Sequence, residues 1–168
     1  NSSVMVMLTY GNNKFLFTGD AENSEENTIT ADIDCDVLKV GHHGSSTSTS
    51  RAFLTAASPE YAVISCGMGN SYGHPHTETL DKLKGAGVKI YRTDLQGDIV
   101  MTCDGENITV NVDAASSDGQ ASGIYVLNTK SMKIHRADCS SVAKIDSKNL
   151  KRTNDYDRAI AAGLPICL

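Results

Sequence analysis

Short apolar runs alternate with polar segments through the first 112 residues of the chain. Runs of this kind, bounded by Gly, Pro, Asn or Ser, are typical of buried β-strands. Helices are predicted at residues 50–57 and 76–85, and a weak, polar helix is predicted at 21–32. Strands are predicted at residues 4–9, 14–18, 36–40, 61–65 and 88–91. The alternation of strands with helices predicts an α/β unit.

Two hairpins frame this unit. Residues 11–13 predict a tight turn between the first two strands. A second hairpin is predicted around Asp104 and Gly105, joining 98–103 to 107–112, because apolar and polar side chains alternate in its later strand. An antiparallel hairpin is therefore expected to close the α/β unit.

A change of composition divides the chain. Residues 114–122 contain no large apolar residue and predict a linker between a domain over 1–113 and a small α+β module over 123–168. The module carries eight Lys or Arg against four Asp, a net charge of +4, whereas the whole chain is at −5. This reversal of charge supports two separate units. A module so small needs a staple, a metal ion or a docking surface to be stable.

The composition narrows the classes of function. The chain has 168 residues with 40% hydrophobic content, a net charge of −5 and a pI near 5.4. No global basic field draws it to nucleic acid, although a metal site can hold phosphates without one. Five widely spaced cysteines exclude a disulfide framework, and Cys35, Cys66 and Cys103 are predicted to be buried thiols. No apolar run approaches the roughly 20 residues of a membrane span.

Acids and histidines follow two of the predicted strands. Asp20 comes just after the strand at 14–18, and His42 and His43 follow the strand at 36–40. Ligands at strand ends can converge on one metal ion, so Asp20 is predicted to bind metal; its alternative role is to cap the next helix. Adjacent residues rarely share one ion. One of His42 and His43 is therefore predicted to bind metal and the other to contact substrate or act as an acid, the alternative being two surface histidines.

Other polar residues are predicted to hold the substrate. Ser45 begins a run of hydroxyl side chains that can donate to phosphate. His74, in a loop bracketed by Gly and Pro, is predicted to protonate a leaving group or to bind a phosphate oxygen, and Asn70 of that loop to bind substrate. His76, two residues later, is interpreted as the residue that starts the helix predicted at 76–85. Asp94 is predicted to bind substrate, or else to be a simple turn residue.

These segments resemble, in order, the C-terminal half of a metallo-β-lactamase-fold hydrolase of the ComEC competence-protein family. The resemblance covers roughly residues 1–112. It rests on Asn1-Ser2-Ser3, Thr18-Gly19-Asp20, 38–48, 70–76 and 91–97. It implies an αββα sandwich, one or two Zn²⁺ or Mn²⁺ ions, and hydrolysis of phosphodiesters by a metal-activated water.

Carried over by position, the resemblance makes Asp20 a bridging carboxylate and makes His42 and His43 a late histidine ligand and its neighbour. One departure is large, because the cluster His-x-His-x-Asp-His of that family is absent here. An open catalytic zinc site needs about three protein ligands. The chain is therefore expected to be a fragment that is inactive alone, with the missing N-terminal half of the same protein as its partner.

The small module resembles an Ada-type zinc-binding module that is often appended to such hydrolases. The resemblance rests on His135, on Cys139 and on the ending over 161–167. It implies a structural zinc ion held by His135, Cys139 and Cys167, with the site completed beyond Leu168. The alternative is a metal-free module whose cysteines are buried or paired.

Together these features predict a metal-dependent hydrolase of phosphodiesters, with nucleic acid as the leading substrate. A hydrolase of another phosphoester, such as a cell-wall phosphodiester, is the second possibility. A non-catalytic remnant that binds nucleic acid or cell wall is the alternative from a different class. Membrane-embedded and exported relatives share these motifs, so the bacterial cell surface or the exterior is favoured over the cytoplasm.

Overall fold

The computed structural model describes residues 3–115, 125–136, 141 and 144–153. The chain divides into two compact units, residues 1–119 and 120–168. Most of the linker predicted over 114–122 lies outside the described residues. The domain boundaries drawn from composition therefore stay a prediction.

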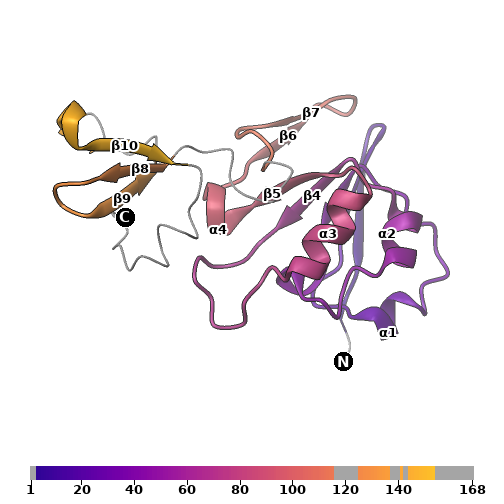
Figure 1. The fold of residues 1–168 in the computed structure, drawn as a ribbon. Coiled ribbons are helices and arrows are strands. Elements are labelled where there is room, and N and C mark those ends of the chain that lie inside the picture. Colours follow the sequence, from indigo (N-terminus) through magenta and orange to yellow (C-terminus); the bar gives the residue numbers. More distant parts are fainter. Residues whose placement is uncertain (1–2, 116–124, 137–140, 142–143, 154–168) are drawn as a thin grey trace. The chain divides into compact units, whose positions relative to one another are not determined.

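A five-stranded mixed sheet forms the centre of the first unit (Figure 1). β1 and β2 form the predicted antiparallel hairpin, whereas β3, β4 and β5 all run parallel to β2. Parallel neighbours need crossover connections, and helices supply them here. In their order across the sheet, the strands are β1 (Val6–Tyr10), β2 (Asn13–Phe17), β3 (Val37–Lys39), β4 (Tyr61–Ile64) and β5 (Lys89–Arg92).

Helices α2 and α3 cover one face of this sheet (Figure 1). Alternate strand residues such as Leu38 and Ile64 point to that face and are fully buried. They pack against Phe53 of α2 and Leu83 of α3 in one apolar core. Truncating a core leucine of this kind costs about 2–5 kcal/mol. The helices of this unit are α1 (Asn23–Glu26), α2 (Arg51–Ala57), α3 (Thr77–Gly85) and α4 (Thr93–Gln96).

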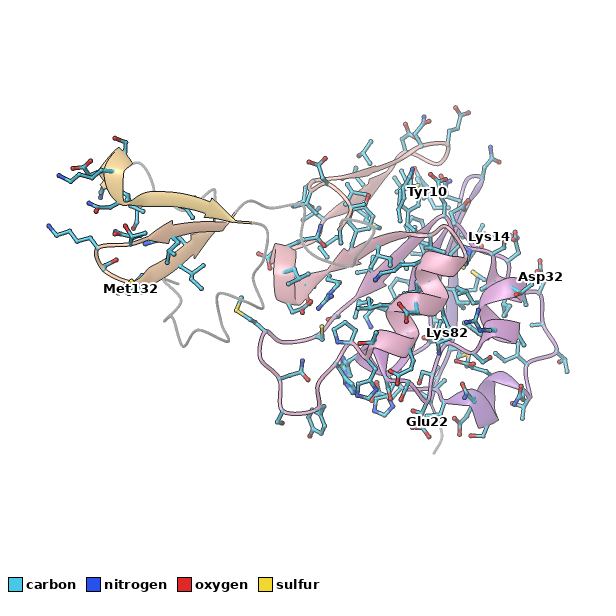
Figure 2. All side chains as sticks on the ribbon, in the orientation of Figure 1. Tyr10, Lys14, Glu22, Asp32, Lys82 and Met132 are labelled. Atoms are coloured by element: carbon cyan, nitrogen blue, oxygen red, sulfur yellow. The ribbon has the colours of Figure 1, made fainter. Side chains whose placement is uncertain are left out.

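Polar contacts anchor the segment that joins the double-histidine turn to α2. The buried Glu26 carboxylate accepts hydrogen bonds from the backbone N–H groups of Thr49 and Ser50. From α3, Lys82 (Figure 2) donates through Nζ to the carbonyl of Ser48 at 2.7 Å. This segment is therefore held from both sides, which fixes the start of α2 and the position of the turn before it.

The opposite face of the sheet is only partly covered. Leu8, Tyr10 and Phe17 on β1 and β2 are 53%, 56% and 44% exposed. The hairpin of β6 (Met101–Cys103) and β7 (Ile108–Val110) lies over part of this face. A cavity of about 600 Å³, lined mostly by apolar side chains, remains between them. This face therefore leaves apolar side chains open to solvent.

Two short helices differ from the sequence prediction. The helix predicted over 21–32 is limited to α1, because the following residues turn away and set Asp32 and Asp34 against Lys14, each with an N–O distance of 3.6 Å (Figure 2). A polar segment with little apolar surface to bury cannot sustain a longer helix. The polar turn predicted after β5 contains the single-turn helix α4.

The second unit is a three-stranded antiparallel sheet in the order β10-β8-β9. Val126 and Ile134 are its buried apolar residues in the described part. The elements are β8 (Tyr125–Asn128), β9 (Lys133–Arg136), the 3₁₀ turn η3 (Ser147–Asn149) and β10 (Leu150–Thr153). The described residues of this unit contain no α-helix. The helical part of the expected α+β module therefore stays a prediction.

The predicted α/β class is confirmed, with one helical layer on one sheet as expected of half an αββα sandwich. Among the residues with described structure, no helix has the length and apolar character to cross a bilayer. Cys35 is buried as predicted, but the prediction was wrong for Cys66 and Cys103, which are only half-buried. Cys66 follows β4 and is partly buried against the core, whereas Cys103 is on β6 and lines the cavity beneath the β6–β7 hairpin.

Burial, helped by Asp34 and Asp36, raises the pKa of the Cys35 thiol to about 12 from an ordinary 9.0. The unfolded chain therefore releases this proton first as the pH rises above 9.0, and the folded state loses stability. We expect Cys35→Ala to reduce the fall in unfolding free energy between pH 8 and 10.5 by about 1–2 kcal/mol in urea titrations. Cys103→Ala is the control; an unchanged pH dependence in Cys35→Ala would contradict the burial argument.

Candidate active site

The residues predicted to carry chemistry gather where three parallel strands end. Asp20 follows β2, His42 and His43 follow β3, and His74 lies in the loop after β4. The C-terminal ends of neighbouring parallel strands meet at one edge of the sheet. The ring centroid of His74 accordingly lies 5.7 Å from that of His42 and 6.4 Å from that of His43.

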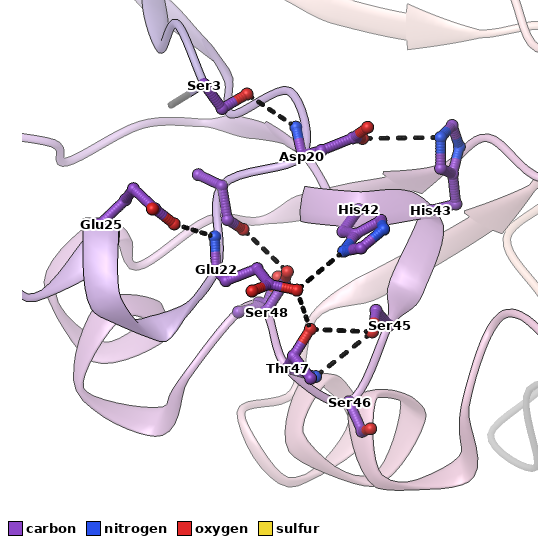
Figure 3. Close-up of polar contacts among 12 residues, drawn as sticks. Ser3, Asp20, Glu22, Glu25, His42, His43, Ser45, Ser46, Thr47 and Ser48 are labelled. Carbon is purple, nitrogen blue, oxygen red and sulfur yellow. Dashed lines mark hydrogen bonds and ion pairs between the residues drawn. The ribbon is translucent and has the colours of Figure 1, made fainter. Parts of the chain in front are cut away.

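Asp20 and His43 form the first carboxylate–histidine pair (Figure 3). His43 Nδ1 lies 2.7 Å from the carbonyl oxygen of Ser65. A carbonyl only accepts, so Nδ1 carries a proton, and in the neutral imidazole the lone pair is therefore on Nε2. Nε2 faces the carboxylate of Asp20 at 3.5 Å, and the backbone N–H of Asp20 donates to the hydroxyl of Ser3. The structure therefore brings together, after β2 and β3, a carboxylate and an imidazole that are 23 residues apart in the sequence.

Glu22 and His42 form the second pair (Figure 3). Glu22 Oε1 lies 3.3 Å from His42 Nδ1 and accepts a hydrogen bond from the hydroxyl of Thr47. Within the described residues, Nδ1 of His42 is buried and makes no hydrogen bond of good geometry. A buried polar atom in this state is costly unless a ligand satisfies it. Asp20, Glu22, His42 and His43 are called the half-site below.

The half-site depends on an unusual backbone turn, η1 (Gly41–Gly44). His42 and His43 both have left-handed conformations, with φ values of 45° and 56°. Each such residue other than glycine costs roughly 1–2 kcal/mol. The turn is held by His42, whose N–H donates to the carbonyl of Gly19 and whose carbonyl accepts from Ser45. The strained turn sends two successive imidazoles to two different carboxylates.

Gly44 lets the loop after β4 approach this turn. A Cβ atom at Gly44 would lie only 2.6 Å from Cβ of Pro75. The φ of Gly44 is +86°, which also favours glycine. The carbonyl of Gly44 accepts from the N–H of His76, so the two segments are joined by a backbone hydrogen bond.

Asn70 shapes the loop that presents His74. Its side-chain N–H groups donate to the carbonyls of Gly67 and His74, and its Oδ1 accepts from the N–H of His74. This amide is therefore used in holding the loop closed. The predicted contact between Asn70 and substrate stays a prediction.

His74 stands at the centre of the imidazole cluster. Burial, and then the neighbouring imidazoles led by His76, lower the pKa of His74 below its ordinary value of 6.5. Its ring nitrogens have no hydrogen-bond partner among the residues that the structure describes. At neutral pH the ring is thus uncharged and open to a ligand. A bound phosphate would favour the protonated form, because an adjacent negative charge raises the pKa of an imidazole.

His76 has a structural role. Its Nδ1 accepts from the N–H of Ser46 at 2.9 Å, so the proton is on Nε2, which donates to the carbonyl of Tyr72 at 3.2 Å. His76 is also the N-cap residue of α3. The ring therefore ties the start of α3 to Ser46, which follows η1, and to Tyr72, in the loop after β4.

Two further predicted residues already have protein partners. The Ser45 hydroxyl, in a buried residue, is paired with that of Thr47 at 3.0 Å. Asp94 is bound in a two-point ion pair by Arg92, with N–O distances of 2.7 and 3.1 Å. Their roles in substrate binding stay predictions.

In the second unit, His135 is buried on β9, while Cys139 and Cys167 lie outside the described residues.

The half-site fits part of a metal centre. Two ligands of one tetrahedral zinc ion, each about 2.0–2.2 Å from it, stand roughly 3.3–3.6 Å apart. The 3.5 Å between Asp20 Oδ1 and His43 Nε2 has this spacing. The described residues nevertheless contain no group of three or more His, Cys, Asp or Glu side chains arranged to hold a metal ion. Further ligands are needed to complete a site.

Comparison with known proteins places these features in a family context. Residues 1–68 match the Metallo-beta-lactamase superfamily. The match spans β1 to β4 and includes the whole half-site. The predicted resemblance to this superfamily is therefore confirmed over the part of the chain that carries the half-site.

Three relatives carry names that refer to the ComE operon, to competence or to recombination. ComE operon protein 3 of Bacillus subtilis is 39% identical over 102 residues, which are 59% of this chain and 13% of that protein. Competence protein ComA of Neisseria gonorrhoeae is 39% identical over 99 residues, 56% of this chain and 14% of that protein. Recombination protein 2 of Haemophilus influenzae is 36% identical over 98 residues, 58% of this chain and 12% of that protein. The chain thus spans about one eighth of their length.

Sequence reasoning missed Glu22 and Ser65. Glu22 was assigned only to a weak helix, although its place two residues after Asp20 is a usable signal for a second carboxylate. Ser65 contributes a backbone carbonyl, which no side-chain pattern reveals. Its position at the end of β4, beside β3, is the feature that brings it to His43.

The positive φ of His43 can be tested through the stability of variants at this position. We expect His43→Gly to be about 1 kcal/mol more stable than His43→Ala in urea unfolding, because glycine adopts positive φ without strain while both changes remove the imidazole. Ala56→Gly on the exposed face of α2 is the matched control and should be destabilising by about 0.5–1 kcal/mol. Equal stability of the two His43 variants would show that the turn is unstrained.

Proposed function

We propose that the first unit supplies part of the active site of a metal-dependent hydrolase that cleaves phosphodiesters in nucleic acid. The observation that carries the proposal is the 3.5 Å approach of Asp20 Oδ1 to His43 Nε2, the ring nitrogen that does not face Ser65. The superfamily match over residues 1–68 supports a hydrolase. The names of two relatives, which refer to competence and to recombination, support nucleic acid over other phosphoesters.

In this proposal Asp20 and His43 hold Zn²⁺ or Mn²⁺ as neighbouring ligands. When bound, one or two such ions supply positive charge beside the phosphate and lower the pKa of a water molecule. Ser65 fixes the tautomer of His43 through the hydrogen bond to Nδ1. Glu22 orients His42 in the same way that a carboxylate commonly orients a histidine near a metal ion.

His42 and His74 act on the substrate in this proposal. Their rings are 5.7 Å apart, so both can reach oxygens of one phosphoryl group. His74 is uncharged before substrate binds, and the approaching phosphate favours its protonation. Protonated His74 can then donate to the leaving oxygen, which is the general-acid role predicted for it.

The remaining ligands are proposed to come from the N-terminal part of the same domain. Two donors are fewer than the roughly three that a catalytic zinc site needs. The partly uncovered sheet face, with Leu8 and Phe17 exposed beside a cavity of about 600 Å³, is proposed as the surface on which that part packs. The much greater length of the relatives supports this arrangement.

We propose the bacterial cell surface or the exterior as the place of action.

A binding role without hydrolysis is the second candidate. It is favoured by the absence, within the described residues, of a group of three metal-binding side chains. In this version the second unit binds nucleic acid or cell wall, and a zinc ion held by His135, Cys139 and Cys167 stabilises it. The buried position of His135 supports its part in such a site.

A hydrolysis assay separates the two candidates. We expect the longer protein that contains this chain to cleave a nucleic-acid phosphodiester with Mn²⁺ or Zn²⁺, to stop when a chelator is added, and to lose at least about 100-fold in kcat/KM on Asp20→Asn or His43→Asn. Glu22→Gln should cost about 10–100-fold, as changes next to metal ligands do.

Glu106→Gln, in the exposed β6–β7 turn, is the control and should keep full activity. The 168-residue chain alone is expected to be inactive under the same conditions. Hydrolysis that survives the chelator, or that Asp20→Asn leaves unchanged, would favour the binding role.

A further inference from the structure

An exposed aromatic ring stands beside the imidazole cluster. Tyr72 is 77% exposed, which is unusual for a large aromatic side chain. Its ring is within 22° of parallel to that of His74, at a centroid distance of 5.8 Å. His74 in turn is within 15° of parallel to His43 at 6.4 Å. Three nearly parallel rings therefore lead from solvent to the half-site.

The backbone that carries Tyr72 is held in place. Its carbonyl accepts a hydrogen bond from Nε2 of His76. The next residue, Gly73, donates its N–H to the carbonyl of Asn70, whose side chain closes the same loop. The Tyr72 ring is exposed, although the backbone on which it is carried is held by hydrogen bonds. A side chain presented in this manner loses little conformational entropy when a ligand binds.

One face of the Tyr72 ring is available. Its single ring–ring contact among the described residues is with His74 on one side. Planar nucleobases stack on aromatic side chains with about 1–3 kcal/mol per base, whatever their sequence. A base in a duplex is already stacked on both faces, whereas an unpaired base offers one. The chemistry of the free face therefore suits an unpaired nucleobase.

We propose that Tyr72 is a stacking platform for an unpaired nucleobase, which sets the phosphate next to that base against His74 and the half-site. The inference rests on the proposed function and deepens it: single-stranded nucleic acid is the substrate class. A phosphodiester polymer without bases, such as a cell-wall polymer, would gain nothing from Tyr72. The platform is a specificity-determining and positioning residue, because it touches the substrate away from the reacting atoms.

Binding by the 168-residue chain tests the platform. We expect fluorescence anisotropy to show tighter binding of labelled oligothymidylate than of an abasic oligonucleotide of equal length and charge. Tyr72→Ala should weaken the oligothymidylate complex by about five- to 100-fold and leave the abasic complex unchanged. Tyr72→Phe should keep wild-type affinity because it keeps the ring, and Tyr72→Leu should resemble Tyr72→Ala.

Tyr10→Ala is the matched control. Tyr10 is also a largely exposed tyrosine, but it lies at the far end of the sheet from Glu22 (Figure 2). The imidazole signals of His74 in NMR spectra should shift on adding oligothymidylate to the wild type and stay unchanged in Tyr72→Ala, which locates the binding.

Equal affinity for the two oligonucleotides, no binding of oligothymidylate, or equal loss in Tyr10→Ala would overturn the proposal. These outcomes are separate from failure of the proposed function. Metal-dependent hydrolysis with no role for Tyr72 would sink the platform alone. Base-dependent binding through Tyr72 without hydrolysis in the longer protein would sink the catalytic proposal alone.

Discussion

The left-handed turn at His42 and His43 is the constraint on which the candidate site depends. In an ordinary turn the two rings would not reach separate carboxylates on the segment after β2. Here the turn is fixed by a hydrogen bond from His42 to Gly19 and by the bond from His43 to Ser65. Strain that persists at a defined position is common at functional sites. The hydrogen bonds that hold the strained turn go to residues that follow β2 and β4, the two strands on either side of β3.

Packing extends this constraint to the neighbouring loop. Gly44 allows Pro75 to approach, and the bond between Gly44 and His76 ties the loop after β4 to the turn. Asn70 then closes that loop around the backbone of His74. His74 is in this way positioned by the same turn that positions the half-site. The site is therefore one hydrogen-bonded assembly built on the ends of three strands.

Much of this arrangement could be predicted from the sequence. Apolar runs located all five strands of the main sheet, and burial explains the apolar character of β3, β4 and β5, since a buried parallel strand is apolar along its length. The prediction of a buried strand over residues 4–9 was wrong, because β1 is antiparallel to β2 and most of its residues are exposed. The placement of Asp20 and the two histidines at strand ends predicted that they converge, and the 3.5 Å contact between Asp20 and His43 agrees. The extent of α1 was wrong, since a polar segment gives no periodic signal that marks where a helix stops.

Other features could not be predicted for physical reasons. The pairing of Glu22 with His42 depends on the positive φ values of η1, and adjacent histidines do not reveal these. The engagement of Asp94 by Arg92 and of Asn70 by its own loop depends on local geometry that many residues could adopt. The roles of His42, His43 and His74 in catalysis stay predictions. The open sheet face is likewise visible only once the strands are assembled.

The protonation state of His43 tests the central claim most directly. Long-range ¹H–¹⁵N NMR spectra of the chain at neutral pH report which ring nitrogen carries the proton. We expect a proton on Nδ1, directed to Ser65, and an unprotonated Nε2 whose ¹⁵N signal moves when Zn²⁺ is added to the longer protein. A proton on Nε2, or a zinc-dependent shift at Nδ1 instead, would contradict the proposed pairing of His43 with Asp20 around one ion.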